Sequence, residues 1–309
     1  MAAMRDVFWN KIFEEAKKNR DIVLLSADFS APSLDKFRLE LPSQYVNLGI
    51  AEQNMMLFAT GMALEGKKAF CYAITPFLTM RCFEQTRLYA AGMKLPITLV
   101  GVGAGFSYSD SGYTHHALED ISIMRTLPHM RIFQPCDNAS VEKMADLILQ
   151  SETPIYLRLD RYGDENLAGD LTNLEKGVNV VRPVKKVTLV ASGYMVKTAL
   201  KAAEQLQQHG IEVGILDTCI LPMDKEFFGE QVKEAEKLVV LEEHVLAGGL
   251  GSYILEVVSD LKLPVQVHRC GLELIDGYIK EYSSRENIHK LCGIDADSVV
   301  KLVKEIEGE

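Results

Sequence analysis

The segment from Asn47 to Gly66 reads Asn-Leu-Gly-Ile-Ala-Glu-Gln-Asn-Met-Met-Leu-Phe-Ala-Thr-Gly-Met-Ala-Leu-Glu-Gly, and it decides the fold. It begins with polar residues and then becomes apolar on nearly every side, which is typical of a helix that is buried all round. Short β-branched runs flank it at Ile22 to Ala27 and at Lys68 to Ala73. A strand, a long helix and a second strand in this order predict parallel strands joined by a crossover helix.

The same alternation continues through the rest of the chain. Further strands are expected at Ile97 to Val102, Met130 to Gln134, Ile155 to Leu159, Val187 to Ala191, Ile211 to Asp217, Leu238 to Glu242 and Val265 to His268. Helices are expected at Met4 to Lys18, Ile50 to Glu65, Leu78 to Met93, Leu118 to Thr126, Ala139 to Gln150, Met195 to His209, Lys225 to Ala235 and Gly249 to Leu261. A polar stretch interrupts the pattern, so we predict two doubly wound α/β domains, residues 1–165 and 185–309, joined by a linker at 166–184.

The composition excludes several classes of protein. The chain has 309 residues with 33 basic and 43 acidic side chains, a net charge of −10, which argues against a nucleic-acid partner because phosphates are bound by clustered Lys and Arg. No apolar run approaches the ~20 residues that cross a bilayer, and the first residues lack the layout of a secretory signal. The six cysteines are scattered without a C-x-x-C pair, so we expect reduced core thiols, no metal site and a cytoplasmic protein without a membrane partner.

Candidate functional residues follow the predicted strands of the first domain. Asp28 follows the first strand, Phe77 follows the strand ending at Ala73, and the loop 103–116 and Arg161 follow two later strands. Ligands of a parallel sheet gather at the carboxyl ends of its strands, because the loops there converge on one crevice. We therefore expect these residues along one edge of the sheet.

Glu52 lies in the first turn of the long helix. One interpretation is that it only complements the helix dipole, an effect of about 0.3–1 kcal/mol. The other is functional: a carboxylate that leads a buried helix faces a sheltered place and needs a specific partner there. We favour the functional interpretation.

The loop 103–116 and the strand after it suggest two more polar groups. The glycines of the loop lack the G-x-G-x-x-G spacing, so a dinucleotide site is not expected. His115 and His116 are adjacent and point opposite ways on an extended backbone, so they cannot share a metal; His115 is predicted to be catalytic, the alternative being a structural histidine. Arg158 and Arg161 close a strand, where an arginine suits a phosphate or carboxylate, the alternative being a surface arginine without a partner.

Three segments carry a resemblance to a known family: Gly49-Ile-Ala-Glu-Gln-Asn-Met, Gly112-Tyr-Thr-His-His and Glu119-Asp-Ile-Ser-Ile-Met-Arg. With them the sequence resembles the transketolase family of thiamine-diphosphate enzymes, over nearly the whole chain. It corresponds only to the pyrimidine-binding and C-terminal domains and lacks the G-D-G motif with its later asparagine, which holds magnesium and the diphosphate. The resemblance implies a subunit of a split transketolase, in an α2β2 assembly whose partner subunits hold Mg²⁺ and the diphosphate of thiamine diphosphate.

The resemblance also implies roles in cofactor binding. Glu52 matches the carboxylate that hydrogen-bonds the aminopyrimidine ring, which favours the tautomer that removes the thiazolium proton. Phe77 matches the aromatic residue that stacks on the pyrimidine, and Ile74 and Met80, three positions to either side, make the rest of that wall apolar. Asp28 matches an aspartate near the thiazolium ring.

For the substrate, the resemblance assigns His115 to the sugar hydroxyls. Ser111 stands where the family has an aspartate, and Gly103 where it has a further histidine, which points away from ordinary pentose phosphates and toward a branched, deoxy or sulfonated ketose. The terminal anion would be bound by Arg161, with support from Arg158, Arg5 and Ser33. The run from Glu242 to Gly251 also resembles the family, whose C-terminal domain serves mainly in assembly, so no catalytic role is expected there.

The leading hypothesis is a transketolase subunit that moves a two-carbon ketol unit from a ketose to an aldose. One alternative is a subunit similar to 1-deoxyxylulose-5-phosphate synthase, which uses pyruvate, or to the β-type decarboxylase subunit of 2-oxo acid dehydrogenases. A second alternative is an assembly subunit that has kept the fold and lost catalysis.

Overall fold

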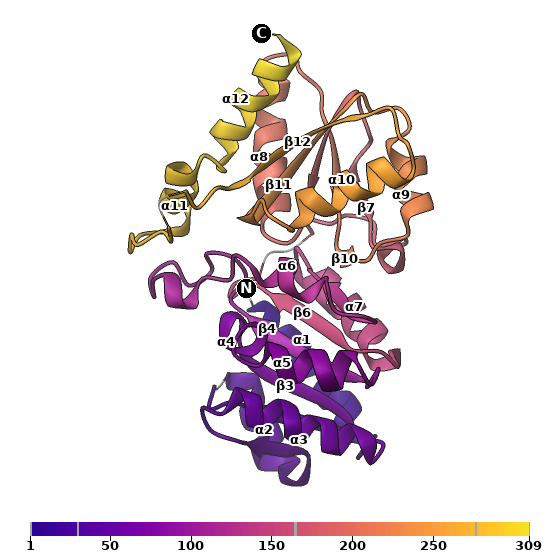
Figure 1. The fold of residues 1–309 in the computed structure, drawn as a ribbon, viewed down its shortest axis with the longest axis vertical. Coiled ribbons are helices and arrows are strands. Elements are labelled where there is room, and N and C mark those ends of the chain that lie inside the picture. The colour runs from indigo at the N-terminus through magenta and orange to yellow at the C-terminus, as the bar shows by residue number, and fades with distance from the viewer. Residues whose placement is uncertain (1, 30, 164–165, 276, 309) are drawn as a thin grey trace.

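The computed structural model describes residues 2–29, 31–163, 166–275 and 277–308, and it contains two α/β domains. They lie one above the other, the N-terminal domain below in indigo to magenta and the C-terminal domain above in pink to yellow (Figure 1). Each is built on a largely parallel sheet, which confirms the predicted fold class. The first domain boundary, at 165, lies outside the described residues.

The sheet of the N-terminal domain has seven strands. Their order is β10 (Ile220–Leu221), β5 (Arg131–Phe133), β6 (Ile155–Leu159), β4 (Ile97–Val102), β3 (Lys68–Ile74), β1 (Ile22–Ser26) and β2 (Tyr45–Asn47). All neighbours are parallel except β10, which pairs antiparallel with β5. Because β10 comes from the second half of the chain, the C-terminal domain supplies an edge strand to the first sheet.

Helices cover both faces of this sheet because both faces are apolar. Ile22 and Leu24 of β1 pack with α1 (Met4–Ala16), whereas Val23 and Leu25 belong to the core that includes α3 (Glu52–Leu64). The other helical segments are α2 (Pro32–Glu40), η1 (Pro42–Gln44), α4 (Thr75–Thr79), α5 (Phe83–Gln85), the π-helical η2 (Thr86–Ala91), η3 (Tyr113–His115), α6 (Asp120–Met124) and α7 (Asn138–Gln150).

The C-terminal domain has a five-stranded sheet. Its order is β12 (Gln266–Leu272), β11 (Lys237–Val245), β8 (Val187–Ala191), β9 (Gly214–Asp217) and β7 (Asn179–Arg182), with β7 antiparallel. The helices are η4 (Leu174–Lys176), α8 (Met195–Gln208), α9 (Lys225–Val232), α10 (Leu250–Asp260), α11 (Arg285–Cys292) and α12 (Ala296–Glu307). Thus η4 and β7 lie within 166–184, where the sequence predicted only a linker, because the polar residues around this short edge strand hide it.

Two helix predictions differ from the structure. The helix expected from Leu78 to Met93 is divided into α4, α5 and η2: the helix is interrupted between Thr79 and Phe83, and α5 then continues directly into η2. The helix α3 is not buried all round: Leu57, Phe58 and Leu64 are 46%, 39% and 58% exposed. The prediction of complete burial was therefore wrong for this chain, because apolar side chains on one side of α3 face outward instead of entering the core.

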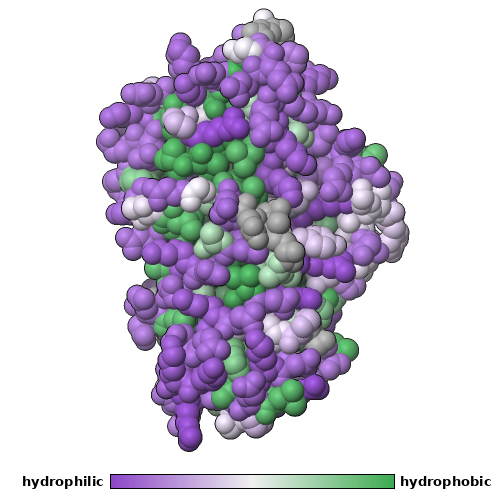
Figure 2. Space-filling view, turned by 180° about the vertical axis from the view of Figure 1, so that it is seen from behind, coloured by the Kyte–Doolittle hydropathy of each residue, from purple (hydrophilic) through white to green (hydrophobic). Residues whose placement is uncertain are grey.

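The molecular surface is otherwise mixed. Seen from behind, it is largely hydrophilic, and its hydrophobic residues gather mainly in the upper, C-terminal half (Figure 2). Among the described residues, no helix is both long and apolar enough for a membrane span. All six cysteines are free thiols, and all but Cys292 are buried.

A buried carboxyl group in β9 makes the stability of the fold depend on pH. Burial raises the pKa of Asp217 to about 8, although the nearby Cys136 and Asn179 side chains partly oppose the rise. The unfolded chain releases this proton near pH 3.9. The neutral Asp217 therefore contributes its full share to the free energy of unfolding below about pH 3.9. This contribution falls as the pH rises and is lost above the folded pKa of about 8.

We predict that Asp217→Asn flattens this dependence, because the amide is neutral in both states. Urea unfolding between about pH 4 and pH 8 should show a smaller decline in the free energy of unfolding than in the wild type. The exposed Asp35, changed to Asn, serves as the control and should leave the decline unchanged. An equal decline in wild type and Asp217→Asn would contradict the prediction.

Candidate functional site

The candidate site lies where β1, β3, β4 and β6 end, since these strands are consecutive in the sheet. The structure brings several of the predicted residues into contact along this edge. The ring centroids of Phe77 and His115 are 5.1 Å apart, and those of His115 and Tyr108 are 6.3 Å apart. The guanidinium carbon of Arg161 lies 5.0 Å from the Tyr108 ring centroid. These four side chains form a continuous row.

Glu52 begins α3 and is almost fully buried, with 3% of its side chain exposed. Both carboxylate oxygens accept hydrogen bonds from Nη1 of Arg81, at 2.9 and 2.8 Å. The guanidinium carbon of Arg81 also lies 4.4 Å from the centroid of the Phe77 ring. A planar cation therefore contacts both the buried carboxylate and the aromatic ring.

The other residues predicted for the cofactor lie around this group. Ile74 ends β3 and Met80 directly follows α4, so they flank Phe77 on the same segment. Asp28 is exposed after β1, with φ of 53°, and accepts a hydrogen bond from Asn47 Nδ2 at 3.2 Å. The backbone N–H of Asp28 donates to Asn47 Oδ1 at 3.1 Å, which fixes the turn after the strand.

His115 and His116 face different surroundings, as their adjacency predicts. His116 is buried against Phe106, with ring centroids 5.0 Å apart. His115 is only partly buried and contacts Phe77 and Tyr108. Burial lowers the pKa of His115, and the opposing effect of Asp110 does not cancel the change. His115 is therefore neutral at pH 7, with a ring that can both donate and accept a hydrogen bond.

Tyr108 fills the space above Gly103. Gly103 has φ of +97°, and a Cβ atom built on it would lie 2.3 Å from Cδ2 and Cε2 of the Tyr108 ring. A side chain at position 103 and the present position of the Tyr108 ring therefore exclude each other. Burial raises the pKa of Tyr108, while Arg5 and Arg161 oppose the rise, which places both cations near the phenol.

Arg161 is held through its backbone as well as its side chain. Its N–H donates to Ser107 Oγ at 2.9 Å, and Ser107 Oγ donates to Asp160 at 3.0 Å. The guanidinium lies 3.4 Å from Asp110, whose other carboxylate oxygen accepts a hydrogen bond from Ser111 at 3.2 Å. Arg161 lines a cavity of about 490 Å³ between the two domains, together with Ser107, Ser109, Asp110, Tyr162, Tyr194, Ser283, Ser284, Arg285 and Glu286.

The remaining anion-binding candidates divide into two groups. Ser33 is buried and donates to Asp6 at 2.7 Å, and Asp6 is 3.9 Å from Arg5. Arg158, in contrast, is buried in an ion pair with Asp120, where Nε donates at 2.6 Å. The prediction that Arg158 supports an anion site needs correction, because its guanidinium is engaged at the start of α6 instead of facing the strand ends.

A buried arginine of the C-terminal domain braces the loop of the site. Arg285, at the start of α11, donates to Glu243 of β11 at 2.8 and 2.5 Å and to Asp160 at 2.6 Å. Burial acts to raise the pKa of Glu243, but Arg285 and His289 outweigh it and hold that pKa well below its ordinary value. Because Asp160 directly precedes Arg161, the C-terminal domain fixes the backbone that carries the anion-binding candidate.

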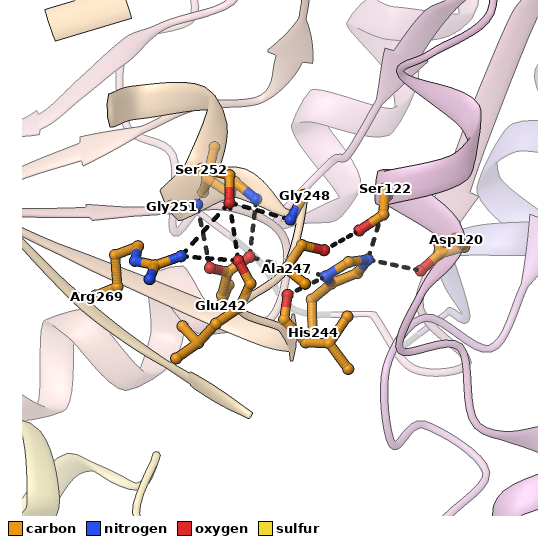
Figure 3. Close-up of polar contacts among 12 residues, drawn as sticks. Asp120, Ser122, Glu242, His244, Ala247, Gly248, Gly251, Ser252 and Arg269 are labelled. Carbon is orange, nitrogen blue, oxygen red and sulfur yellow. Dashed lines mark hydrogen bonds and ion pairs between the residues drawn. The ribbon is translucent and has the colours of Figure 1, made fainter. Parts of the chain in front are cut away.

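The polar run at the end of β11 and after it makes a second contact between the domains, shown in Figure 3. Glu242 accepts hydrogen bonds from the N–H groups of Leu250 and Gly251, at 2.8 and 3.1 Å, and so caps α10. His244 reaches α6, where its Nε2 lies 3.4 Å from the N–H of Ser122. Burial lowers the pKa of His244 to about 4, so the ring is neutral at pH 7. These contacts give the polar residues from Glu242 to Gly251 a structural role: they cap α10 and join the two domains.

Sequence reasoning did not single out Arg81, Tyr108 or Arg285. The only available signal was indirect: a glycine at 103 leaves space that another side chain must fill.

Among the described residues, no group of three or more His, Cys, Asp or Glu side chains is arranged to hold a metal. The Glu52 carboxylate and the Phe77 ring could hold a planar cofactor ring, one by a hydrogen bond and the other by stacking.

Comparison with known proteins identifies two family domains in the chain. Residues 1–163 match the pyrimidine-binding domain of transketolase, and residues 176–299 match the transketolase C-terminal domain. A subunit of the apulose-4-phosphate transketolase of Phocaeicola vulgatus is 31% identical over 309 residues, covering 99% of this chain and 97% of that protein. The 6-deoxy-6-sulfo-D-fructose transketolase subunit SqwH of Clostridium sp. (strain MSTE9) is 31% identical, covering 98% of this chain and 94% of that protein.

A solved structure agrees with these matches. A split-gene transketolase, solved as an inactive β4 tetramer, superimposes with a TM-score of 0.85 at 31% identity. The superposition covers 98% of this chain and 97% of that one.

We predict that Arg285→Met destabilises the protein by about 3–5 kcal/mol, because it leaves Glu243 and Asp160 buried without their cation. Urea unfolding at pH 7 measures the loss. Arg182→Met is the matched control: Arg182 lies 3.9 Å from Glu204 at the surface, where an ion pair contributes about 0–1 kcal/mol. A loss below about 1 kcal/mol for Arg285→Met would show that the brace is not a main stabilising contact.

Proposed function

The chain belongs to the transketolase family, and on that basis we propose that it is the subunit of a split, thiamine-diphosphate-dependent transketolase that carries the pyrimidine-binding and C-terminal domains. Its reaction is the transfer of a two-carbon ketol unit from a ketose to an aldose. The observation that carries the proposal is the buried Glu52 carboxylate beside the Phe77 ring, with a planar cation already in contact with both.

Glu52 and Phe77 fit the aminopyrimidine ring of the cofactor. A planar ring stacked on Phe77 can present a nitrogen to Glu52, and this arrangement combines an aromatic stack with a hydrogen bond to a desolvated carboxylate. When bound, thiamine diphosphate supplies the carbon nucleophile that accepts the two-carbon unit. Glu52 holds the pyrimidine in the orientation and protonation state that this chemistry requires, while Ile74 and Met80 exclude water from the ring.

The row from His115 to Arg161 fits the substrate. His115 is neutral and adjoins Phe77, so it can hydrogen-bond a sugar hydroxyl near the reacting carbons and move its proton. Arg161 lies at the other end of the row, beyond Tyr108, where it can bind a phosphate or another terminal anion. Arg5, Ser33 and Ser111 lie on the remaining sides of the anion site in this proposal, and Asp28 adjoins the cofactor.

The substrate is in our proposal a modified ketose with an anionic end. The Tyr108 ring occupies the space above Gly103, where the family has a histidine side chain. Ser111 is shorter than the aspartate of the family and carries no charge. Both features reduce the number of groups that can read sugar hydroxyls. Two relatives act, by their names, on apulose 4-phosphate and on 6-deoxy-6-sulfo-D-fructose, which supports a branched, deoxy or sulfonated sugar.

A partner subunit completes the site. The sequence lacks the motif that binds magnesium and diphosphate, and the outward side of α3, the helix that begins at Glu52, exposes Leu57, Phe58 and Leu64 along its length. Apolar side chains grouped on one helix face are typical of an interface. We propose that the diphosphate-binding subunit covers this face in an α2β2 assembly and holds Mg²⁺ and the diphosphate.

The proposal is tested on the chain combined with its cognate diphosphate-binding subunit, thiamine diphosphate and Mg²⁺. We expect transfer of labelled glycolaldehyde units from a ketose phosphate or sulfonate to an aldose, no such transfer by the chain alone, and no carbon dioxide release from pyruvate.

Glu52→Gln should lower kcat by about a thousandfold or more, since it removes the group that orients the cofactor.

The exposed Glu84, changed to Gln, is the matched control and should retain activity, while circular dichroism checks that the Glu52 variant folds. Near-normal turnover by Glu52→Gln would contradict the role of Glu52. Carbon dioxide release from pyruvate would favour the synthase or decarboxylase alternative, and no activity with any ketose would favour a non-catalytic assembly subunit.

Tyr108 should act on the anionic end of the substrate. Tyr108→Val removes the ring beneath Arg161, so we expect KM for an anionic ketose to rise about tenfold with kcat little changed, and KM for an uncharged ketose to stay constant. Tyr108→Phe keeps the ring and should remain close to the wild type. Tyr162 also lies near Arg161, at 5.6 Å, but is exposed, so Tyr162→Val is the matched control. Equal effects of the two Val variants would contradict the prediction.

A further inference from the structure

Arg81 lies between α4 and α5, at the point where this segment passes the start of α3. Its side chain is 44% exposed, whereas the Glu52 side chain to which it binds is 3% exposed. The backbone carbonyl of Arg81 accepts a hydrogen bond from Gln53 Nε2 at 3.0 Å, which fixes the base of the side chain beside Glu52. The guanidinium thus extends from a fixed backbone position over Phe77, with its outer side toward solvent.

The guanidinium makes the two contacts that the proposed function assigns to the aminopyrimidine. It donates to both oxygens of Glu52, and it lies 4.4 Å from the centroid of Phe77. Guanidinium and aminopyrimidine are both flat, carry N–H groups in their plane and can lie against an aromatic face. One carboxylate and one ring face cannot serve both groups in these positions at once.

Building on the proposed function, we propose that the Arg81 guanidinium is a stand-in for the aminopyrimidine ring: it occupies that place in the unloaded chain and leaves it when the cofactor binds. Arg81 is thereby a further residue of the cofactor site, one that competes with the cofactor for Glu52 and Phe77.

The burial of Glu52 explains why a stand-in is needed. A carboxylate that is 3% exposed is costly without a partner, and removal of the partner of a buried charge is strongly destabilising. Arg81 satisfies Glu52 as long as the cofactor is absent. Since Arg81 reaches solvent and Glu52 does not, the exchange proceeds by movement of Arg81 alone, and the carboxylate stays where the cofactor needs it.

The decisive measurement is cofactor affinity, not turnover. The chain in complex with its diphosphate-binding subunit is titrated with thiamine diphosphate in the presence of Mg²⁺, and the Kd is determined by calorimetry. Arg81→Met keeps the length and apolar stem of the side chain but removes the competing cation, so we expect the Kd to fall about tenfold. Arg87→Met, an exposed arginine six residues along the chain, is the matched control and should stay within about twofold.

Thermal unfolding provides a second readout that does not depend on the titration. Without cofactor, Arg81→Met should melt at a lower temperature than the wild type, because Glu52 is then buried without a cation. Saturating cofactor should raise the Tm of Arg81→Met more than that of the wild type.

An unchanged or higher Kd for Arg81→Met overturns the inference, and a higher Kd would make Arg81 a direct ligand of the cofactor. The proposed function survives either result as long as the wild-type complex binds thiamine diphosphate and transfers ketol units. If the wild-type complex does neither, the proposed function fails and the inference fails with it.

Discussion

The ion pairs of Arg285 hold the two domains in register, and the rest of the site depends on them. This one guanidinium links Glu243 in the core of the C-terminal domain to Asp160 at the end of β6. Asp160 in turn accepts from Ser107, and Ser107 accepts from the N–H of Arg161. A chain of hydrogen bonds, charge-assisted at Glu243 and Asp160, therefore runs from the second sheet to the loop that carries Tyr108 and His115, and a desolvated network of this kind is rigid only when every member is paired.

This arrangement explains what the C-terminal domain does in a chain whose candidate chemistry lies entirely in the other domain. Close approach of the domains requires a glycine at 105, because a Cβ atom there would lie 1.9 Å from Glu243 Oε2. The edge strand β10 and the contact of His244 with α6 add two further attachments. The C-terminal domain thus acts as a rigid support for the loop 103–116, and its contacts account for the polar run from Glu242 to Gly251 without a catalytic group there.

The sequence was sufficient for the fold class and for the placement of several candidate side chains along one edge of the sheet, because both follow from regular periodicity. Parallel strands end at one edge, so Phe77, His115 and Arg161 could be expected together from their positions after the predicted strands. Arg81, Tyr108 and Arg285 could not be found in this way, since each meets its partner through a tertiary contact that no local pattern records. Arg158 shows the same limit: its position on β6 suggested an anion site, whereas Asp120, 38 positions away in sequence, determines its real partner.

The helix α3 illustrates how a prediction can be wrong about one chain for an instructive reason. Its sequence is apolar on nearly every side, yet the side bearing Leu57, Phe58 and Leu64 is exposed, while the opposite side carries Met55, Met56 and Ala59 into the core. An apolar sequence pattern predicts that a surface is buried, but it does not distinguish burial within a chain from burial between chains. Glu52 begins this same helix on its buried side, with only 3% of its side chain exposed within the single chain. In the proposed assembly the interface and the cofactor carboxylate therefore lie on opposite sides of one helix, so docking of the partner buries the exposed apolar side chains and fixes the helix whose first residue is the carboxylate that holds the pyrimidine.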